Sequence, residues 1–121
     1  MSIAAAEPGR PESPLYRHLV ADARRALTTA EIGEVTGVSG RAVQKWAQGA
    51  TKPDGSSRDR LLELMYVIEQ ISDVYDDEGV EIWLHAKLRA FDGQAPIALL
   101  REGRFEEVLG VIERLAGGPR R

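Results

Sequence analysis

Apolar positions along the chain recur every three or four residues, which is the spacing of a helix face rather than of a strand. The clearest stripe predicts a long helix over residues 61–75 and consists of Leu61, Leu64, Met65, Ile68 and Ile71. Leu62, Tyr66 and Val67 widen the stripe, so we expect this helix at the centre of the core or shared with a second subunit. No segment alternates apolar and polar residues over a useful length, and the expected fold class is all-α.

Residues typical of helix ends divide the rest of the chain into shorter helices. Thr28 and Glu31 fit a Ser/Thr-x-x-Glu capping box, which predicts the start of a second helix that Gly37 ends. Residues 52–57 are rich in glycine, proline and serine and predict a loop, whereas Pro96 fits the first position of a later helix. We therefore expect about seven short helices, the first over 15–27 and the others starting near 28, 39, 61, 76, 96 and 105.

The segment 29–46 has the features of a helix-turn-helix motif. Gly33 allows close approach of two helices, Gly37 makes the turn, and Ser39 caps the second helix. The predicted contact between the helices is apolar and contains Ile32, Val38, Val43 and Trp46. The predicted outer face of the second helix, with one lysine after it, supplies the candidate DNA-binding residues Ser39, Gly40, Arg41, Gln44, Lys45, Gln48 and Lys52. Arginine and glutamine suit base edges and lysine suits phosphate, so this face predicts operator DNA as a partner.

An ordinary αα-turn could carry the same glycines and caps, in which case Arg41 and Lys45 would be solvated surface charges. Trp46 is expected in the core under either interpretation. A chain with one DNA-reading helix makes few phosphate contacts, so DNA binding in turn predicts a homodimer on a two-fold operator.

Composition and charge narrow the class of protein. The 121 residues carry a net charge of −3, but residues 1–60 hold nine Lys/Arg against seven Asp/Glu, and residues 61–121 hold seven against twelve. Any nucleic-acid affinity must therefore come from a local basic patch, and the two halves suggest two partners. The chain has no cysteine, no apolar run near the roughly 20 residues of a membrane span, and no signal peptide at its start. We expect a cytoplasmic protein without a membrane partner.

Candidate catalytic and metal-binding residues are lacking in the sequence. His18 and His85 stand without the second histidine or carboxylate of a metal site. The acids 76–78 lack the alternating ligands of a calcium loop and are expected at a helix start, where the dipole favours them. No phosphate-binding loop or nucleophile motif occurs. We expect no catalytic residue, no metal, no cofactor and no enzymatic activity.

The C-terminal half carries an ordered set of short motifs. Trp83-Leu84 is followed by Phe91-Asp-Gly-Gln-Ala-Pro96, by Leu99-Leu-Arg-Glu-Gly103 and by an apolar helix that ends at Gly117. In this order, downstream of a helix-turn-helix, the motifs resemble the MbcA/ParS/Xre antitoxin family over residues 15–118. The resemblance implies the antitoxin of a type II toxin–antitoxin pair, which blocks a RES-domain toxin that consumes NAD⁺ and represses its own operon.

The resemblance also implies a division of the chain and a toxin-binding surface. The expected parts are a disordered arm at 1–14, an Xre-like helix-turn-helix domain at 15–60, a connecting or dimerisation helix at 61–75, a toxin-binding domain at 76–118 and a tail at 119–121. Transferred by position, the toxin-facing residues are Gly103, Arg104, Phe105 and, near the end of the last helix, Arg114. Arg120 and Arg121 are added because of the charge and expected exposure of the tail, which could reach an anion-binding nucleotide pocket. Most apolar residues of this half, Phe105 included, are also candidates for the core.

Two other functions remain open from the sequence. The chain could be a stand-alone transcriptional regulator whose C-terminal half dimerises or senses an effector. It could also be an adaptor without DNA affinity. The identity of the neighbouring gene and the effect of removing Arg41 and Lys45 on promoter binding separate these alternatives.

Overall fold

The computed structural model describes residues 13–117, and within this range all regular secondary structure is helical apart from an isolated bridge between Leu88 and Gln94. The helices are α1 (Ser13–Ala23), α2 (Thr29–Thr36), α3 (Gly40–Gln48), α4 (Gly55–Ser72), α5 (Asp77–His85), the 3₁₀ turn η1 (Arg89–Phe91), α6 (Pro96–Arg101) and α7 (Phe105–Leu115). The all-α prediction is therefore confirmed. No helix in the described part of the chain is both long and apolar enough to span a bilayer.

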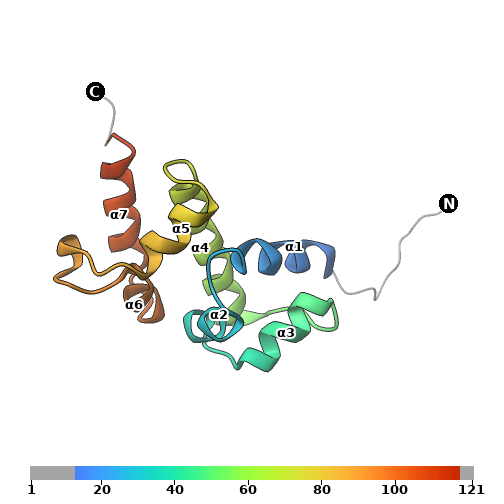
Figure 1. Ribbon diagram of the computed structural model, residues 1–121. Helices are drawn as coiled ribbons and strands as arrows, with labels where there is room; N and C mark the ends of the chain where they lie inside the picture. The colour runs from blue at the N-terminus through green and yellow to red at the C-terminus, as the bar shows by residue number, and fades with distance from the viewer. Residues whose placement is uncertain (1–12, 118–121) are drawn as a thin grey trace.

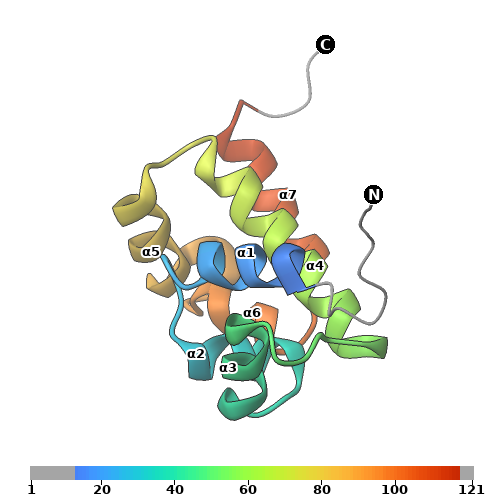
Figure 2. The same ribbon diagram turned by 90° about the vertical axis from the view of Figure 1, so that its right-hand side faces the viewer.

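The long helix α4 lies at the centre of the molecule. Helices α2 and α3 lie at its N-terminal end, α1 packs across it, and α6 and α7 lie on the side away from α1 (Figure 1). In the turned view, α7 runs beside α4 and α1 crosses it (Figure 2). On α4, Leu61, Leu64 and Ile71 are fully buried, whereas Leu62 and Tyr66 are exposed. The stripe thus faces the core of this chain together with Val67, which is also fully buried, whereas Leu62 and Tyr66 face outward.

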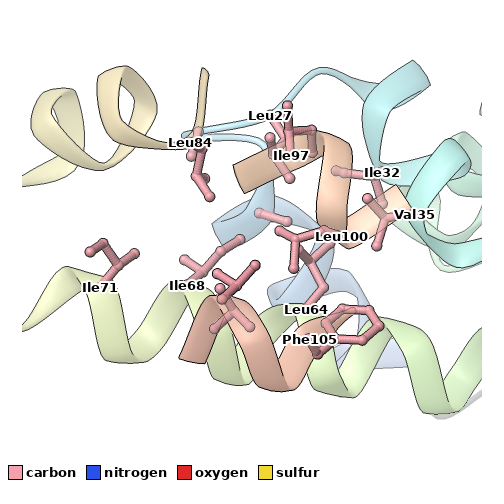
Figure 3. Packing of buried hydrophobic residues seen from close by; sticks show 14 of the residues in the cluster. Leu27, Ile32, Val35, Leu64, Ile68, Ile71, Leu84, Ile97, Leu100 and Phe105 are labelled. Atoms are coloured by element: carbon pink, nitrogen blue, oxygen red, sulfur yellow. The ribbon is translucent and has the colours of Figure 1, made fainter. Parts of the chain in front are cut away.

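Buried side chains from both halves of the chain form a continuous cluster. Ile32 and Val35 of α2 point toward Ile97 and Leu100 of α6, and Leu64 of α4 lies close by (Figure 3). All five side chains are no more than 4% exposed. The predicted domains therefore share one hydrophobic core, which holds α2 against the C-terminal half.

Local capping confirms most of the expected helix ends. Thr28 and Glu31 form the capping box of α2, with the Thr28 side chain accepting from the Glu31 amide at 3.1 Å and the Thr28 amide donating to Glu31 Oε1 at 2.9 Å. Asp76 caps α5 by accepting from the Gly79 amide at 2.9 Å. Pro96 occupies the first turn of α6, as expected.

The bounds of two helices, α1 and α4, differ from those predicted. Helix α4 begins at Gly55, inside the segment expected to be a loop, because Ser57 donates to the Asp54 carbonyl at 2.7 Å and completes a first turn. Helix α1 begins at Ser13 and ends at Ala23, where the Leu27 amide bonds back to the Ala23 carbonyl at 2.9 Å. Residues 1–12 of the expected arm and the tail 119–121 lie outside the described residues.

Candidate functional site

The turn between α2 and α3 depends on two glycines. A Cβ added at Gly33 would lie 2.6 Å from the Val38 carbonyl oxygen, so the two helices approach as closely as the sequence predicts. Gly37 has φ of 84°, in the left-handed region that favours glycine. The amides of Gly37 and Val38 both donate to the Gly33 carbonyl, at 2.7 and 2.9 Å. This geometry ends α2 and starts α3 at a defined angle.

Helix α3 has one buried side and one exposed side. Ser39 caps it by accepting from the Ala42 amide at 3.1 Å, and Val43 and Trp46 are buried against the neighbouring helices. Six of the seven predicted DNA-binding residues are exposed and the seventh, Gly40, is half-buried; the exposed ones are Ser39, Arg41, Gln44, Lys45, Gln48 and Lys52. The structure therefore brings the candidate residues of α3 together on an accessible, basic surface.

The turn between α6 and α7 contains the first of the candidate toxin-facing residues. Gly103 has φ of 78°, and a Cβ there would lie 2.9 Å from Nη2 of Arg60 on α4. Arg104 is exposed and pairs with Glu107 at 2.8 Å and with Glu102 at 3.0 Å. Hydrogen bonds to these two carboxylates raise the pKa of Arg104 further, and the Arg104 guanidinium lowers the pKa of Glu107. The turn therefore presents the Arg104 guanidinium, which two carboxylates hold in place.

The other candidate toxin-facing residues are placed differently. Phe105 is 5% exposed and points into the core beside Leu64 (Figure 3), so its assignment to the partner surface is corrected to a core role. An aromatic ring at the start of an amphipathic helix gains more from burial than from exposure. Arg114 is exposed near the end of α7, whereas Arg120 and Arg121 lie outside the described residues.

Three polar contacts tie α2 to the rest of the molecule, and the sequence analysis missed all of them. Glu31 pairs with His85 of α5 at 2.8 Å, and Glu34 pairs with Arg101 of α6 at 2.6 Å. Arg60 of α4 donates to the carbonyl of Val35 at 3.0 Å. Each pair joins residues at least 25 positions apart, so no local pattern in the sequence could have indicated it.

The pKa values of the Glu31–His85 pair are shifted in opposite directions. Burial lowers the pKa of His85, but hydrogen bonds to the Glu81 carbonyl and to Glu31 outweigh burial and raise it above 6.5. Burial raises the pKa of Glu31, but the Thr28 amide and His85 outweigh this effect and lower it. The pair therefore favours the ionised form of both groups.

Groups of histidines and acids able to hold a metal ion are absent from residues 13–117. A cleft of about 340 Å³ lies between α1, α4 and α5, with an apolar floor and a charged rim. Its floor is formed by Leu19, Ala26, Met65, Ile68 and Val80. The candidate residues of α3 and of the α6–α7 turn do not line this cleft, so it belongs to neither predicted surface.

Comparison with known proteins identifies the family. Residues 73–118 match the model of the antitoxin Xre/MbcA/ParS C-terminal toxin-binding domain. The chain is 30% identical over 95 residues to the mycobacterial cidal antitoxin MbcA of Mycobacterium bovis, covering 78% of this chain and 84% of that protein. The chain belongs to the Xre/MbcA/ParS antitoxin family. It is also 38% identical over 92 residues to a probable mycobacterial cidal antitoxin of Mycobacterium tuberculosis, covering 76% of this chain and 78% of that protein.

The fold of this antitoxin-family chain is also similar to that of a chain in a solved structure. A chain of the crystal structure of the M. tuberculosis MbcT–MbcA toxin–antitoxin complex superposes with a TM-score of 0.74 at 28% sequence identity. The match covers 88% of this chain and 97% of that chain. The resemblance stated from the sequence motifs is thus confirmed at the level of family and fold.

Proposed function

We propose that the chain is the antitoxin of a type II pair, which binds and blocks a RES-domain toxin that consumes NAD⁺. The observation that carries the proposal is the match of residues 73–118 to a toxin-binding domain. The structural likeness to a chain of a toxin–antitoxin complex supports it. In this proposal the chain acts in the cytoplasm, has no cofactor and has no enzymatic activity of its own.

The second part of the proposal is that the antitoxin represses its own operon through α3. The exposed side of α3 offers Arg41 and Gln44 to base edges and Lys45 to phosphate, as DNA-reading helices do. Because a single α3 reads few base pairs, we propose that a homodimer binds a two-fold operator. The chain would thus use residues 15–60 for DNA and residues 76–118 for the toxin.

The proposed toxin-binding surface combines the α6–α7 turn with the end of the chain. Gly103 and Arg104 form the turn, and Arg114 lies farther along α7 on the way to the tail. Arg120 and Arg121 of the tail would reach the anion-binding nucleotide pocket of the toxin, where a guanidinium can pair with the phosphates of a bound nucleotide. Truncation after Gly118 is expected to weaken neutralisation of the toxin in a growth assay. Full neutralisation by the truncated chain would remove the tail from the proposal.

The decisive experiment separates the two surfaces. Replacing Arg41 and Lys45 with alanine removes two exposed positive charges from α3 and should weaken operator binding at least tenfold. A bidentate base contact of Arg41 would contribute about 1–3 kcal/mol, and loss of a phosphate contact of Lys45 would weaken binding further. The same variant should neutralise the toxin as the wild type does. Operator binding is measured by gel shift on the promoter of the chain's own operon, and neutralisation by growth during expression of the neighbouring gene.

A matched control removes the same charge from a distant loop. Lys87→Ala with Arg89→Ala deletes two exposed cations after α5 and should leave operator affinity within about twofold. Operator binding that is equally weakened by both variants would reflect net charge rather than α3. A neighbouring gene whose expression does not stop growth would favour the stand-alone regulator instead.

A further inference from the structure

The side of α4 that faces away from the core carries an ordered row of side chains. Arg58, Leu62, Met65 and Glu69 follow one another at intervals of four, three and four positions. This is the spacing of the residues through which two helices pack in a coiled coil. The row has a basic residue at one end, two apolar residues in the middle and an acidic residue at the other end. We name these four residues the outer row of α4.

The outer row is accessible in the single chain. Arg58, Leu62 and Glu69 are exposed, and Met65 is half-buried where it lines the cleft between α1 and α4. Leu62 is 41% exposed, and Tyr66, one turn farther along α4 and beside the row, is 52% exposed. Neighbouring apolar side chains on one exposed face indicate an interface, whereas a single exposed apolar side chain does not.

Helix α1 extends this apolar surface. Its Leu19 lines the same cleft as Met65 of α4. Leu15 lies one turn before Leu19 on α1, and it is 57% exposed. The exposed apolar surface therefore covers parts of two helices.

The two charged ends of the outer row have little support within the chain. Arg58 lies 3.7 Å from its chain neighbour Asp59, and both side chains are at least 50% exposed. The Glu69 side chain forms no hydrogen bond or ion pair within residues 13–117. Eleven positions separate Arg58 from Glu69, which is about 16–17 Å along a helix, so the two cannot pair within one chain. Both charges are available to another molecule.

An antiparallel second copy of α4 provides a partner for every residue of the outer row. The middle of the row lies between Leu62 and Met65, and Arg58 and Glu69 are equally far from it. In an antiparallel pair, Arg58 of each copy therefore faces Glu69 of the other copy. Between these two ion pairs, Leu62 of each copy packs on Met65 of the other. A parallel pair would instead bring like charges together at both ends, which is unfavourable.

The same register aligns the two helices along their full length. Helix α4 covers Gly55–Ser72, and its midpoint coincides with the middle of the outer row. An antiparallel pair centred there leaves neither helix end without a neighbour. The arrangement has two-fold symmetry, so each contact occurs twice.

We propose that two copies of the chain associate through the outer rows of their α4 helices, packed antiparallel about a two-fold axis. Two ion pairs flank an apolar centre, and Tyr66 of each copy lies beside it. The inference rests on the function proposed above, for which it names the surface that forms the homodimer.

This association leaves both proposed binding surfaces free. The outer row includes no candidate DNA-binding residue of α3, and none of its four residues lines the cavity beside the α6–α7 turn. Helix α3 lies at the N-terminal end of α4 (Figure 1). Antiparallel packing therefore places the two copies of α3 at opposite ends of a helix pair about 27 Å long. The half-sites of a two-fold operator are about 34 Å apart, which is a similar separation.

The test exchanges the two charges in the full chain, without DNA or toxin. Arg58→Glu alone and Glu69→Arg alone each place like charges at both ends of the antiparallel pair and should weaken dimerisation about fivefold or more. The double variant Arg58→Glu with Glu69→Arg restores opposite charges and should dimerise within about twofold of the wild type. Because positions 58 and 69 do not touch within one chain, such recovery requires contact between copies. Sedimentation equilibrium over a series of protein concentrations measures the Kd of the dimer.

A matched pair of alanine variants tests the apolar centre. Leu62→Ala shortens an exposed side chain of the outer row, and Ile82→Ala shortens one on α5 that is 61% exposed. Leu62→Ala should weaken dimerisation about tenfold, since each dimer loses two buried side chains. Ile82→Ala should leave the Kd of the dimer within about twofold. Both positions are exposed, so circular dichroism should show the wild-type helix content in both variants.

Three results would overturn the inference. They are a wild-type chain that stays monomeric up to about 1 mM, a double charge variant that dimerises no better than the single variants, and equal dimerisation of Leu62→Ala and Ile82→Ala. A Leu62→Ala variant that dimerises normally but no longer neutralises the toxin would assign the outer row to the toxin instead. A chain that dimerises as expected but binds no operator would refute the proposed repression and support the interface.

Discussion

Substitution of Gly33 by alanine tests whether the α2–α3 contact is as close as the structure shows. The added Cβ would lie 2.6 Å from the Val38 carbonyl oxygen, 3.2 Å from the Ser39 carbonyl carbon and 3.3 Å from the Gly40 nitrogen. Non-bonded heavy atoms prefer separations of about 3.5–4.0 Å. All three neighbours are backbone atoms, so the strain cannot be relieved by rotation of a side chain and α3 must move.

The expected magnitude is a balance of two effects. Overpacking by one methyl group costs about 1–3 kcal/mol, whereas alanine gains up to about 1 kcal/mol over glycine as a helix former. Because the 2.6 Å contact is with a backbone atom, the cost lies in the upper part of this range, at about 2–3 kcal/mol. The net loss in the free energy of unfolding is therefore about 1–2 kcal/mol. For a domain of this size, that loss lowers the melting temperature by about 4 °C or more.

Gly110 supplies a matched control within the same chain. It lies in the interior of α7, and a Cβ added there would meet no described atom within 4 Å. Gly110→Ala should therefore raise the free energy of unfolding by up to about 1 kcal/mol through helix propensity alone. The open space also shows that Gly110 makes no close helix contact within residues 13–117.

Thermal unfolding followed by circular dichroism measures both variants, and a gel shift measures operator binding. We expect opposite shifts of the melting temperature, with operator binding reduced in Gly33→Ala because α3 is displaced. A Gly33→Ala variant that melts at or above the temperature of Gly110→Ala would refute the close approach of α2 and α3.

Three further predictions concern single side chains. Ser39→Ala removes the acceptor for the Ala42 amide and should cost about 1 kcal/mol in urea unfolding, whereas an unchanged stability would contradict the cap. Leu100→Ala empties a fully buried position between α2 and α4 and should cost about 2–5 kcal/mol in a single cooperative transition; separate transitions of the two halves would contradict the shared core. His85→Gln should cost a few tenths of a kcal/mol, up to about 1 kcal/mol, at pH 6 and less at pH 8.5. The raised pKa of His85 makes its contribution complete at low pH and lost as the pH rises through the folded value, while the lowered pKa of Glu31 means that its contribution is lost in strong acid.

Contacts between residues that lie close together along the chain could be predicted from the sequence. The capping box of α2, the Ser39 cap and Pro96 at the start of α6 each depend on atoms within three or four positions, and the structure contains all of them. The fold class followed from the same local periodicity. The close approach of α2 and α3 at Gly33 was predictable for the related reason that the atoms nearest to Gly33 belong to residues within seven positions.

Errors arose where local signals have two interpretations. Glycine and serine at 55–57 are common in loops and also at helix starts, and the turn completed at Asp54 selected the helix. Phe105 fitted both a core position and a contact surface, and the pairing of α7 with α4 buried it. In both cases the sequence was compatible with two structures, and a contact with a neighbouring segment determined which of them formed.

The sequence by itself determined the helical class, the caps and turns, and the order of motifs that resembles the antitoxin family. Each of these features depends on residues that lie close together along the chain. Tertiary structure decided which face of α4 is buried, that both halves share a core, and that Glu31 and Glu34 meet His85 and Arg101. Those contacts join residues 54 and 67 positions apart. Their formation depends on how α2, α5 and α6 pack together, and no periodicity or local spacing carries that information.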